Sequence, residues 1–186
     1  MISLTDLWLP ILVSAALVFV VSSLVHMVLQ WHNSDARALP AEDKTLAALR
    51  SAGVSAGEYR FPHCSSMKEM GSPEFAAKLQ SGPVGHMTVF AGGSHGMGKS
   101  LLQWFIYCVV IGVFVAYTAS LALQRGADYS VVFRFTGTVA VLGYALGSVT
   151  NSIWKGVPWS TTFKFIVDGV AYGLVTAGAF GWLWPK

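Results

Sequence analysis

The sequence predicts an all-α integral membrane protein: a bundle of four transmembrane helices, with a small mixed α/β loop region between the first and second helices. Composition is the first reason. Hydrophobic residues make up 54% of the 186 and charged residues 11%, against roughly 25% charged residues in a soluble domain. The mean hydropathy of +0.56 agrees. The other reasons are that the apolar residues form four long runs and that tryptophans mark the ends of these runs.

Each apolar run is long enough to cross a bilayer as a helix. A hydrocarbon core of about 30 Å needs about 20 helical residues. The runs span residues 7–31, 101–123, 130–154 and 163–184. We therefore expect the first transmembrane helix within residues 1–31, an extramembrane loop region at residues 32–100, and three helices within residues 101–186 that complete the bundle.

The tryptophans support these boundaries. An indole ring has an apolar body and a polar N–H group, so it prefers the headgroup level of a membrane. Trp159 lies in the connection between the third and fourth runs, and the other tryptophans fall at run ends. Four spans place both termini on one side of the membrane and the loop region on the other.

The lysines and arginines near the span ends predict the orientation, because cytoplasmic segments carry an excess of these residues. More of them lie beside the loop region than beside the termini. On the loop side these are Arg37, Lys44, Lys99, Lys155 and Lys164, and on the terminal side Arg125, Arg134 and Lys186. We expect a multi-pass protein of a bacterial inner membrane, with loop 32–100 in the cytoplasm and both termini in the periplasm. The start MISLTDLW lacks the basic segment that opens a cleaved signal peptide.

The loop region is predicted to be partly folded. Residues 39–53 begin with proline and acidic residues and end with glycine, a pattern typical of a short helix. We expect Ser72 to cap a second helix that starts at Pro73 and ends at Gly82. Residues 58–64 and 84–90 are expected to be extended. A region of roughly 65 residues is marginal as an independent core, so we expect it to rest on the membrane domain or a partner.

Residues 93–100, GSHGMGKS, fit the pattern G-x-x-x-x-G-K-[ST] of a phosphate-binding loop. A working loop of this kind belongs to an α/β domain and needs further acidic residues to hold magnesium. Here a membrane span follows, so we interpret the match of Gly93, Gly98, Lys99 and Ser100 as chance and expect no nucleotide binding. In this interpretation the glycines form a turn, Ser100 caps the second span and Lys99 reaches headgroup phosphates.

Small residues spaced by four predict how the helices pack, since close approach through small side chains holds helices together in lipid. The fourth run has the most complete stripe. It consists of Gly169, Gly173, Ala177 and Gly181; shorter stripes are Gly112, Ala116 and Ser120, and Gly143 with Gly147. We expect a compact bundle with the fourth helix central. The alternative is that one stripe serves a homodimer or a larger complex.

Ionisable side chains inside spans are costly and suggest function. At 1.5 Å per residue, His26 and Asp168 lie about 7 and 8 Å from the loop-side end of their spans, whereas Arg134 lies about 6 Å from the opposite end. His26 and Asp168 can therefore pair, with Asn151 and Cys108 at nearby depth. Such a cluster can be a structural tie, a proton relay, a ligand site or a metal site, and Arg134 can reach headgroups.

The loop also contains residues with soft donor atoms. Imidazole, thiolate and thioether groups together suit copper, but no established metal-binding spacing is present. The candidates are His63, Cys64, Met67 and Met70, followed by His86, Met87, His95 and Met97. We expect no cofactor, with copper as the alternative.

These features lead to two hypotheses for function. The first is a non-enzymatic scaffold or accessory subunit, whose partners are the lipid bilayer and other membrane subunits or a second copy of itself. The alternative is a small carrier, or a redox-linked or metal-linked protein, that uses the His26 and Asp168 region. The formal charge of +3 does not indicate nucleic acid. Two cysteines suggest no disulfide framework.

Overall fold

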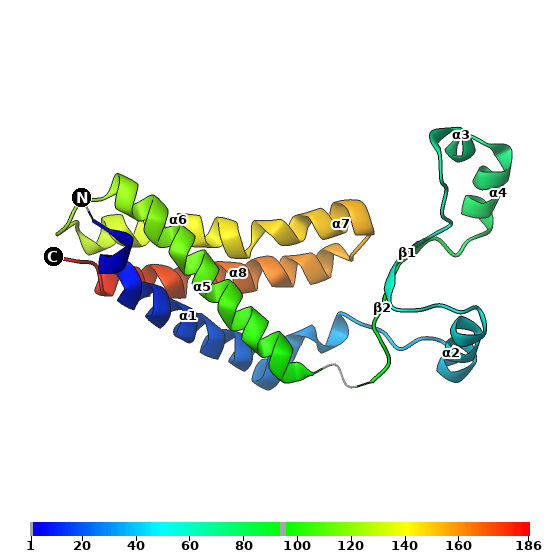
Figure 1. The fold of residues 1–186 in the computed structure, drawn as a ribbon, viewed down its shortest axis with the longest axis horizontal. Coiled ribbons are helices and arrows are strands. Elements are labelled where there is room, and N and C mark those ends of the chain that lie inside the picture. Colours follow the sequence, from blue (N-terminus) through cyan, green and yellow to red (C-terminus); the bar gives the residue numbers. More distant parts are fainter. Residues whose placement is uncertain (1, 94–95) are drawn as a thin grey trace. The chain divides into compact units, whose positions relative to one another are not determined.

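The computed structural model describes residues 2–93 and 96–186 and divides the chain into two compact units. Unit 1 consists of Met1–Ala36, Gly96–Ile153 and Val157–Lys186, and unit 2 of Arg37–His95 and Trp154–Gly156. Unit 1 contains four helices that are long and apolar enough to cross a membrane, as the sequence predicts (Figure 1).

The first span is less regular than expected. A 3-10 turn at Leu4–Leu7 leads into α1, Trp8–Ser23, which continues as a π-helical segment at Leu24–Leu29. The span then ends, because Gln30 adopts the left-handed conformation with φ of 51°, and a second 3-10 turn follows at Trp31–Ser34. The helical span Leu4–Leu29 therefore lies within residues 1–31 and ends two residues before the apolar run does.

The second span, α5, runs from Met97 to Ala122 and starts earlier than the apolar run. Gly96 is its N-cap residue, and the N–H groups of Lys99 and Ser100 both bond to the Gly96 carbonyl. Ser100 therefore lies in the first turn, and the expectation that it caps the span is wrong. Of the phosphate-loop pattern, positions 94 and 95 lie outside the described residues, and Gly98, Lys99 and Ser100 are helical.

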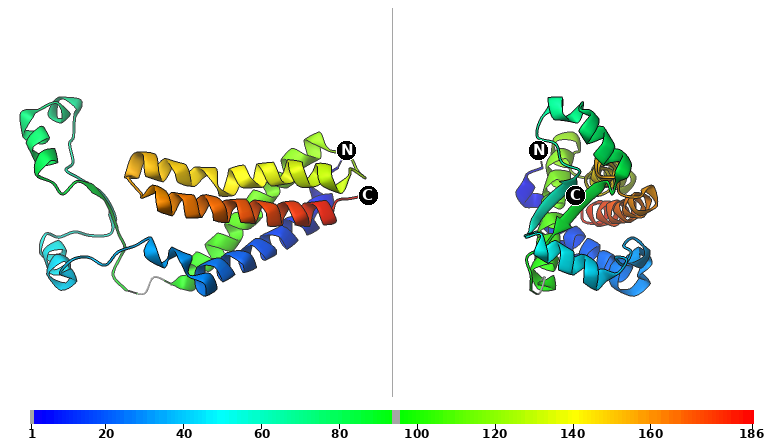
Figure 2. Two further views of the ribbon diagram at one scale, coloured as in Figure 1. Left: turned by 180° about the vertical axis from the view of Figure 1, so that it is seen from behind. Right: turned by 90° about the vertical axis from the view of Figure 1, so that its right-hand side faces the viewer.

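The third and fourth spans form an antiparallel pair. The third comprises α6, Tyr129–Tyr144, a 3-10 turn at Leu146–Ser148 and α7, Val149–Lys155. The fourth is α8, Trp159–Trp182, which also starts before its apolar run. Figure 2 shows α6 and α8 side by side along most of their length.

The small residues of α8 make this close approach possible. A Cβ added at Gly169 would lie 2.6 Å from the Cα of Ala145, and one at Gly181 would lie 2.7 Å from the Tyr129 ring. A Cβ at Gly173 would meet the Val141 side chain and lie 3.0 Å from the Val141 nitrogen. The stripe thus packs against α6 within the chain. Helix α8 also contacts α1 and is the most buried of the four spans. Each of the other spans likewise packs on two neighbours, so a central place for α8 stays a prediction.

The helices of unit 1 are tightly packed at one end, which we name the closed end. Its core consists of Ile2, Leu7, Ile11, Val115, Ala116, Ala119, Val132, Ala140, Phe180 and Trp184. The Trp184 indole N–H donates to the Gln124 carbonyl at 3.0 Å. Both ends of the chain lie here, and α1 and α5 diverge from α6 and α8 toward the opposite, open end (Figures 1 and 2).

Unit 2 contains short elements that match the predictions for the loop region. Helix α2 is Glu42–Ser51, and strands β1, Gly57–Phe61, and β2, Gly85–Val89, pair antiparallel with Tyr59 opposite Met87. Between the strands lie α3, Met67–Met70, and α4, Pro73–Ser81. The Ser72 hydroxyl accepts the Phe75 N–H at 3.1 Å, so Ser72 caps α4 as predicted, and Gly82 ends it.

Candidate functional site

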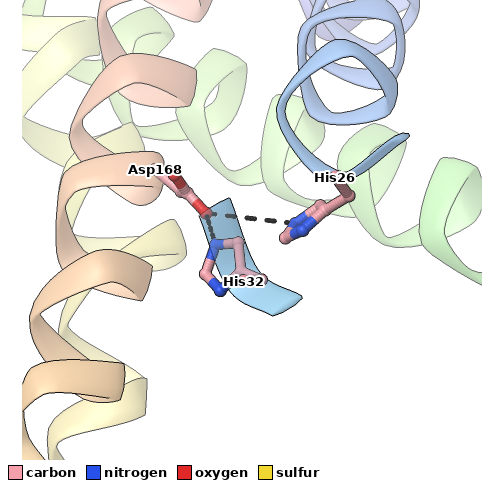
Figure 3. Close-up of side chains that lie close together, drawn as sticks. All are labelled: His26, His32 and Asp168. Atoms are coloured by element: carbon pink, nitrogen blue, oxygen red, sulfur yellow. Dashed lines mark hydrogen bonds and ion pairs between the residues drawn. The ribbon is translucent and has the colours of Figure 1, made fainter. Parts of the chain in front are cut away.

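The chain reversal after the first span brings His32 onto α8. The left-handed Gln30 and the 3-10 turn that follows fold residues 31–34 back toward the bundle. His32 Nε2 then lies 2.7 Å from Asp168 Oδ2, within hydrogen-bonding distance (Figure 3). The His32 ring also packs on Phe165, with ring centroids 4.8 Å apart. His32 therefore supplies the polar partner that the buried Asp168 carboxylate needs.

A second carboxylate holds the other side of the His32 ring. His32 Nδ1 lies 2.6 Å from Asp35 Oδ2, and the Lys164 ammonium donates to Asp35 Oδ1 at 2.6 Å. Lys164 also donates to the Trp31 carbonyl at 2.7 Å, which ties the 3-10 turn to α8. Burial alone would raise the pKa of Asp35, but the hydrogen bonds from Lys164 and His32 outweigh it and hold this pKa below its usual value.

His26 completes a group of three potential metal ligands. Its Nε2 lies 3.9 Å from Asp168 Oδ2, and its ring centroid is 4.6 Å from that of His32. One donor atom from each of the three residues lies within 4.8 Å of the others. Among the described His, Cys, Asp and Glu residues, no other three converge in this way. Figure 3 shows both imidazole rings directed at the carboxylate.

A cavity of about 570 Å³ adjoins this cluster at the open end. All four spans contribute to its wall. The wall is mostly apolar and aromatic, and its rings are those of Trp104, Tyr107, Tyr144, Phe165 and Tyr172. The His26 imidazole, the Asp168 carboxylate and several serine hydroxyls add polar groups to this apolar wall.

Hydrogen bonds fix two rings of the cavity wall, those of Trp104 and Tyr107. The Trp104 indole N–H donates to the Ser22 hydroxyl at 2.8 Å, and the Tyr107 hydroxyl donates to the Gly143 carbonyl at 2.9 Å. The Trp104 ring centroid lies 5.8 Å from that of Tyr172. Trp104, which we expected at a span end, thus lies about two turns inside α5. The buried Tyr172 hydroxyl has no hydrogen-bonding partner among the described residues.

The structure brings some of the sequence-predicted site residues together and leaves others apart. His26 and Asp168 are neighbours. Asn151 is exposed on α7, and Cys108 is buried beside Ala15 and Val18; neither belongs to the cavity wall. Arg134 is exposed on α6. The predicted four-residue cluster is thus reduced to its first pair.

Most candidate copper ligands lie in unit 2, whereas Met97 is the first residue of α5 in unit 1. His63, Met67 and Met70 are exposed and Cys64 is half-buried. Within the described part of unit 2, no three His, Cys, Asp or Glu side chains come together. His95 lies outside the described residues. A copper site in the loop stays a prediction.

Three residues of the cluster did not emerge from the sequence: His32, Asp35 and Lys164. Two signals point to them in hindsight. His32 and Asp35 follow the first apolar run directly, on the same side of the bundle as the end of α8 that carries Asp168. Lys164 precedes Asp168 by four residues, so the two share one helix face.

Comparison of the chain with protein-family models, with curated proteins and with solved structures finds no match. The function has to be inferred from the geometry of the site.

Proposed function

We propose that this chain is a multi-pass membrane protein that binds one lipid molecule in the cavity at the open end of the bundle. The observation that carries the proposal is the composition of the cavity wall, which is mostly apolar and aromatic and includes the His26 imidazole and the Asp168 carboxylate. A volume of about 570 Å³ also lies within the ~300–1,000 Å³ of typical ligand pockets.

The depth of these groups matches a lipid's own orientation. Asp168 lies toward the loop-side end of α8, and Tyr172 follows it by one helical turn, about 6 Å deeper. On α5, Ser100 lies in the first turn and Trp104 one turn deeper. A lipid lying along the spans would thus put its headgroup beside His26 and Asp168 and an acyl chain against the rings.

The structure gives less support to the scaffold hypothesis. The small-residue stripe of α8, the best candidate for a partner helix, packs against α6. We accordingly favour the carrier alternative, without chemical conversion of the ligand. A bacterial inner membrane location is part of the proposal, and the excess of Lys and Arg beside the loop region supports an orientation with the loop in the cytoplasm and the termini in the periplasm.

Photocrosslinking tests the proposal. The protein is reconstituted with a phosphatidylcholine whose acyl chain carries a diazirine, irradiated, and mapped by peptide mass spectrometry. We expect crosslinks on Trp104, Tyr144 and Tyr172, because these rings line the cavity. Ser23→Phe, which projects a ring into the cavity, should reduce them at least severalfold.

Ser120→Phe is the matched control. Ser120 and Ser23 are both half-buried, and both hydroxyls donate to a carbonyl of the preceding turn, but Ser120 is not part of the cavity wall. It should leave the crosslinks unchanged. Labelling confined to the exposed faces of the spans, or equal labelling in both variants, would contradict the proposal.

A further inference from the structure

We infer that His26, His32 and Asp168 form a binding site for a divalent first-row transition-metal ion, with Zn²⁺ as the simplest probe. Two imidazole nitrogens and one carboxylate oxygen suit such ions. The three donor atoms lie within 4.8 Å of one another and come from the end of the first span, the 3-10 turn after it, and α8. This inference stands independently of lipid binding.

The spacing of the donors fits a tetrahedral ion. Bonds of about 2.0–2.2 Å place neighbouring ligand atoms about 3.3 Å apart. The distance from His32 Nε2 to Asp168 Oδ2 is 2.7 Å, and that from His26 Nε2 to the same oxygen is 3.9 Å. These two distances bracket the required value, and the two imidazole nitrogens lie within 4.8 Å of each other. The exposed His26 side chain would have to move toward the other two donors to complete the site.

His32 is also held in the orientation that a ligand needs. A metal-binding histidine donates its second ring N–H to a carboxylate or carbonyl, which fixes the tautomer and the ring direction. Asp35 lies 2.6 Å from His32 Nδ1 and is itself bound by Lys164. An ion would take the place of the Nε2 proton that lies between His32 and Asp168, while Nδ1–H keeps its bond to Asp35. Asp35 and Lys164 are therefore positioning residues.

Burial and charge favour a cation at this place. The Asp168 side chain is 4% exposed, and a buried carboxylate is stable only when it is paired or coordinates a cation. His26 and Asp168 also belong to the cavity wall. The fourth coordination position would therefore face the cavity, open to water or to the polar group of a bound molecule.

Metal binding to the full chain tests the inference. The protein is purified in detergent, treated with EDTA, dialysed against Zn²⁺ and analysed for metal content. We expect one Zn²⁺ per chain and a zinc-dependent rise in the melting temperature, because an ion that binds only the folded state stabilises it. Co²⁺ should give the ligand-field absorption of a nitrogen- and oxygen-bound ion, without a thiolate charge-transfer band.

The variants identify the ligands. The His26 side chain is exposed, so His26→Ala should fold normally yet lose the zinc-dependent stabilisation. Asp168→Asn should weaken binding at least 100-fold. Asp35→Asn should weaken it by about 10–100-fold, as for other residues that orient a ligand. The control His63→Ala should change nothing. The inference would be overturned if the wild-type chain bound no Zn²⁺ or if His26→Ala still bound it. Loss of bound Zn²⁺ in His63→Ala would also overturn it, because the ion would then lie in the loop.

Discussion

The closed and open ends of unit 1 are built from the same four spans but differ in what lies between the helices. At the closed end Leu7, Val115, Val132 and Phe180 have no exposed surface. At the open end α1 and α5 diverge from α6 and α8, and a cavity of about 570 Å³ remains. Ionisable groups approach each other at the open end, around Asp168.

This difference separates residues that hold the bundle together from residues available for binding. Interior packing stabilises a protein most where side chains fill the space completely. A cavity lacks part of that stabilisation because side chains do not fill it. Polar groups at membrane depth are costly and are retained mainly for function. We therefore expect substitutions at the closed end to change stability and those at the open end to change binding.

The largest effect is expected for Phe180→Ala at the closed end. Phe180 is fully buried, and removal of a buried phenylalanine ring costs about 3–5 kcal/mol. Thermal unfolding in detergent measures it. The control is Phe163→Ala, on the same helix but 65% exposed, which should cost little. Equal losses in both variants would contradict a tightly packed closed end.

The next effect is expected for Gly173→Ala. The new Cβ would meet Val141, including its backbone nitrogen at 3.0 Å, and overpacking of this kind costs about 1–3 kcal/mol. Gly178→Ala is the control, because a Cβ there meets no described atom within 4 Å. It should stabilise the helix by about 0.5–1 kcal/mol. If unfolding experiments show a loss of stability for Gly173→Ala and a gain for Gly178→Ala, they confirm which face of α8 contacts α6.

Much of the fold could be predicted from the sequence, because run length alone identifies a membrane span. The boundaries were less accurate. Helices α5 and α8 start at Met97 and Trp159, before their apolar runs, since a helix continues into the headgroup level where polar residues are tolerated. Hydropathy indicates which residues are buried in lipid, but it does not indicate where a helix begins or ends.

The site could be predicted only in part. Counting residues along each span places His26 and Asp168 at one depth, but it does not tell in which direction a side chain points around the helix axis. Asn151 lies at a similar depth and yet is exposed. His32 reaches Asp168 only because Gln30 adopts a left-handed conformation. Few residues other than glycine do so, and nothing in the sequence signals it at this position.

A double-mutant cycle at the open end should give a smaller effect. His32→Ala combined with Asp168→Asn is expected to show a coupling energy of about 1 kcal/mol, since interhelical hydrogen bonds in membranes average ~0.6 and reach ~1.7 kcal/mol. The cycle of His26→Ala with Asp168→Asn is the comparison. Its coupling should be weaker because the two atoms lie 3.9 Å apart. The reverse order would mean that His26, and not His32, is the partner of Asp168.

The smallest effect is expected for Trp104→Phe. The substitution keeps an aromatic ring at the cavity but removes the indole N–H that donates to the Ser22 hydroxyl, which should cost about 0.5–1.5 kcal/mol. The Ser22 hydroxyl keeps its own bond to the Phe19 carbonyl. Trp154→Phe, 79% exposed, should leave the melting temperature unchanged. A loss as large as that of Phe180→Ala would mean that the open end is packed like the closed end.

Native mass spectrometry of the protein released from lipid nanodiscs tests the difference between the two ends most directly. The account predicts that each wild-type chain retains one lipid after the annular lipids are stripped. It predicts that Ser23→Phe, at the cavity wall, loses this lipid and that Ser120→Phe keeps it. Wild-type chains that retain no lipid, or equal retention in the two variants, would contradict a lipid-binding cavity at the open end.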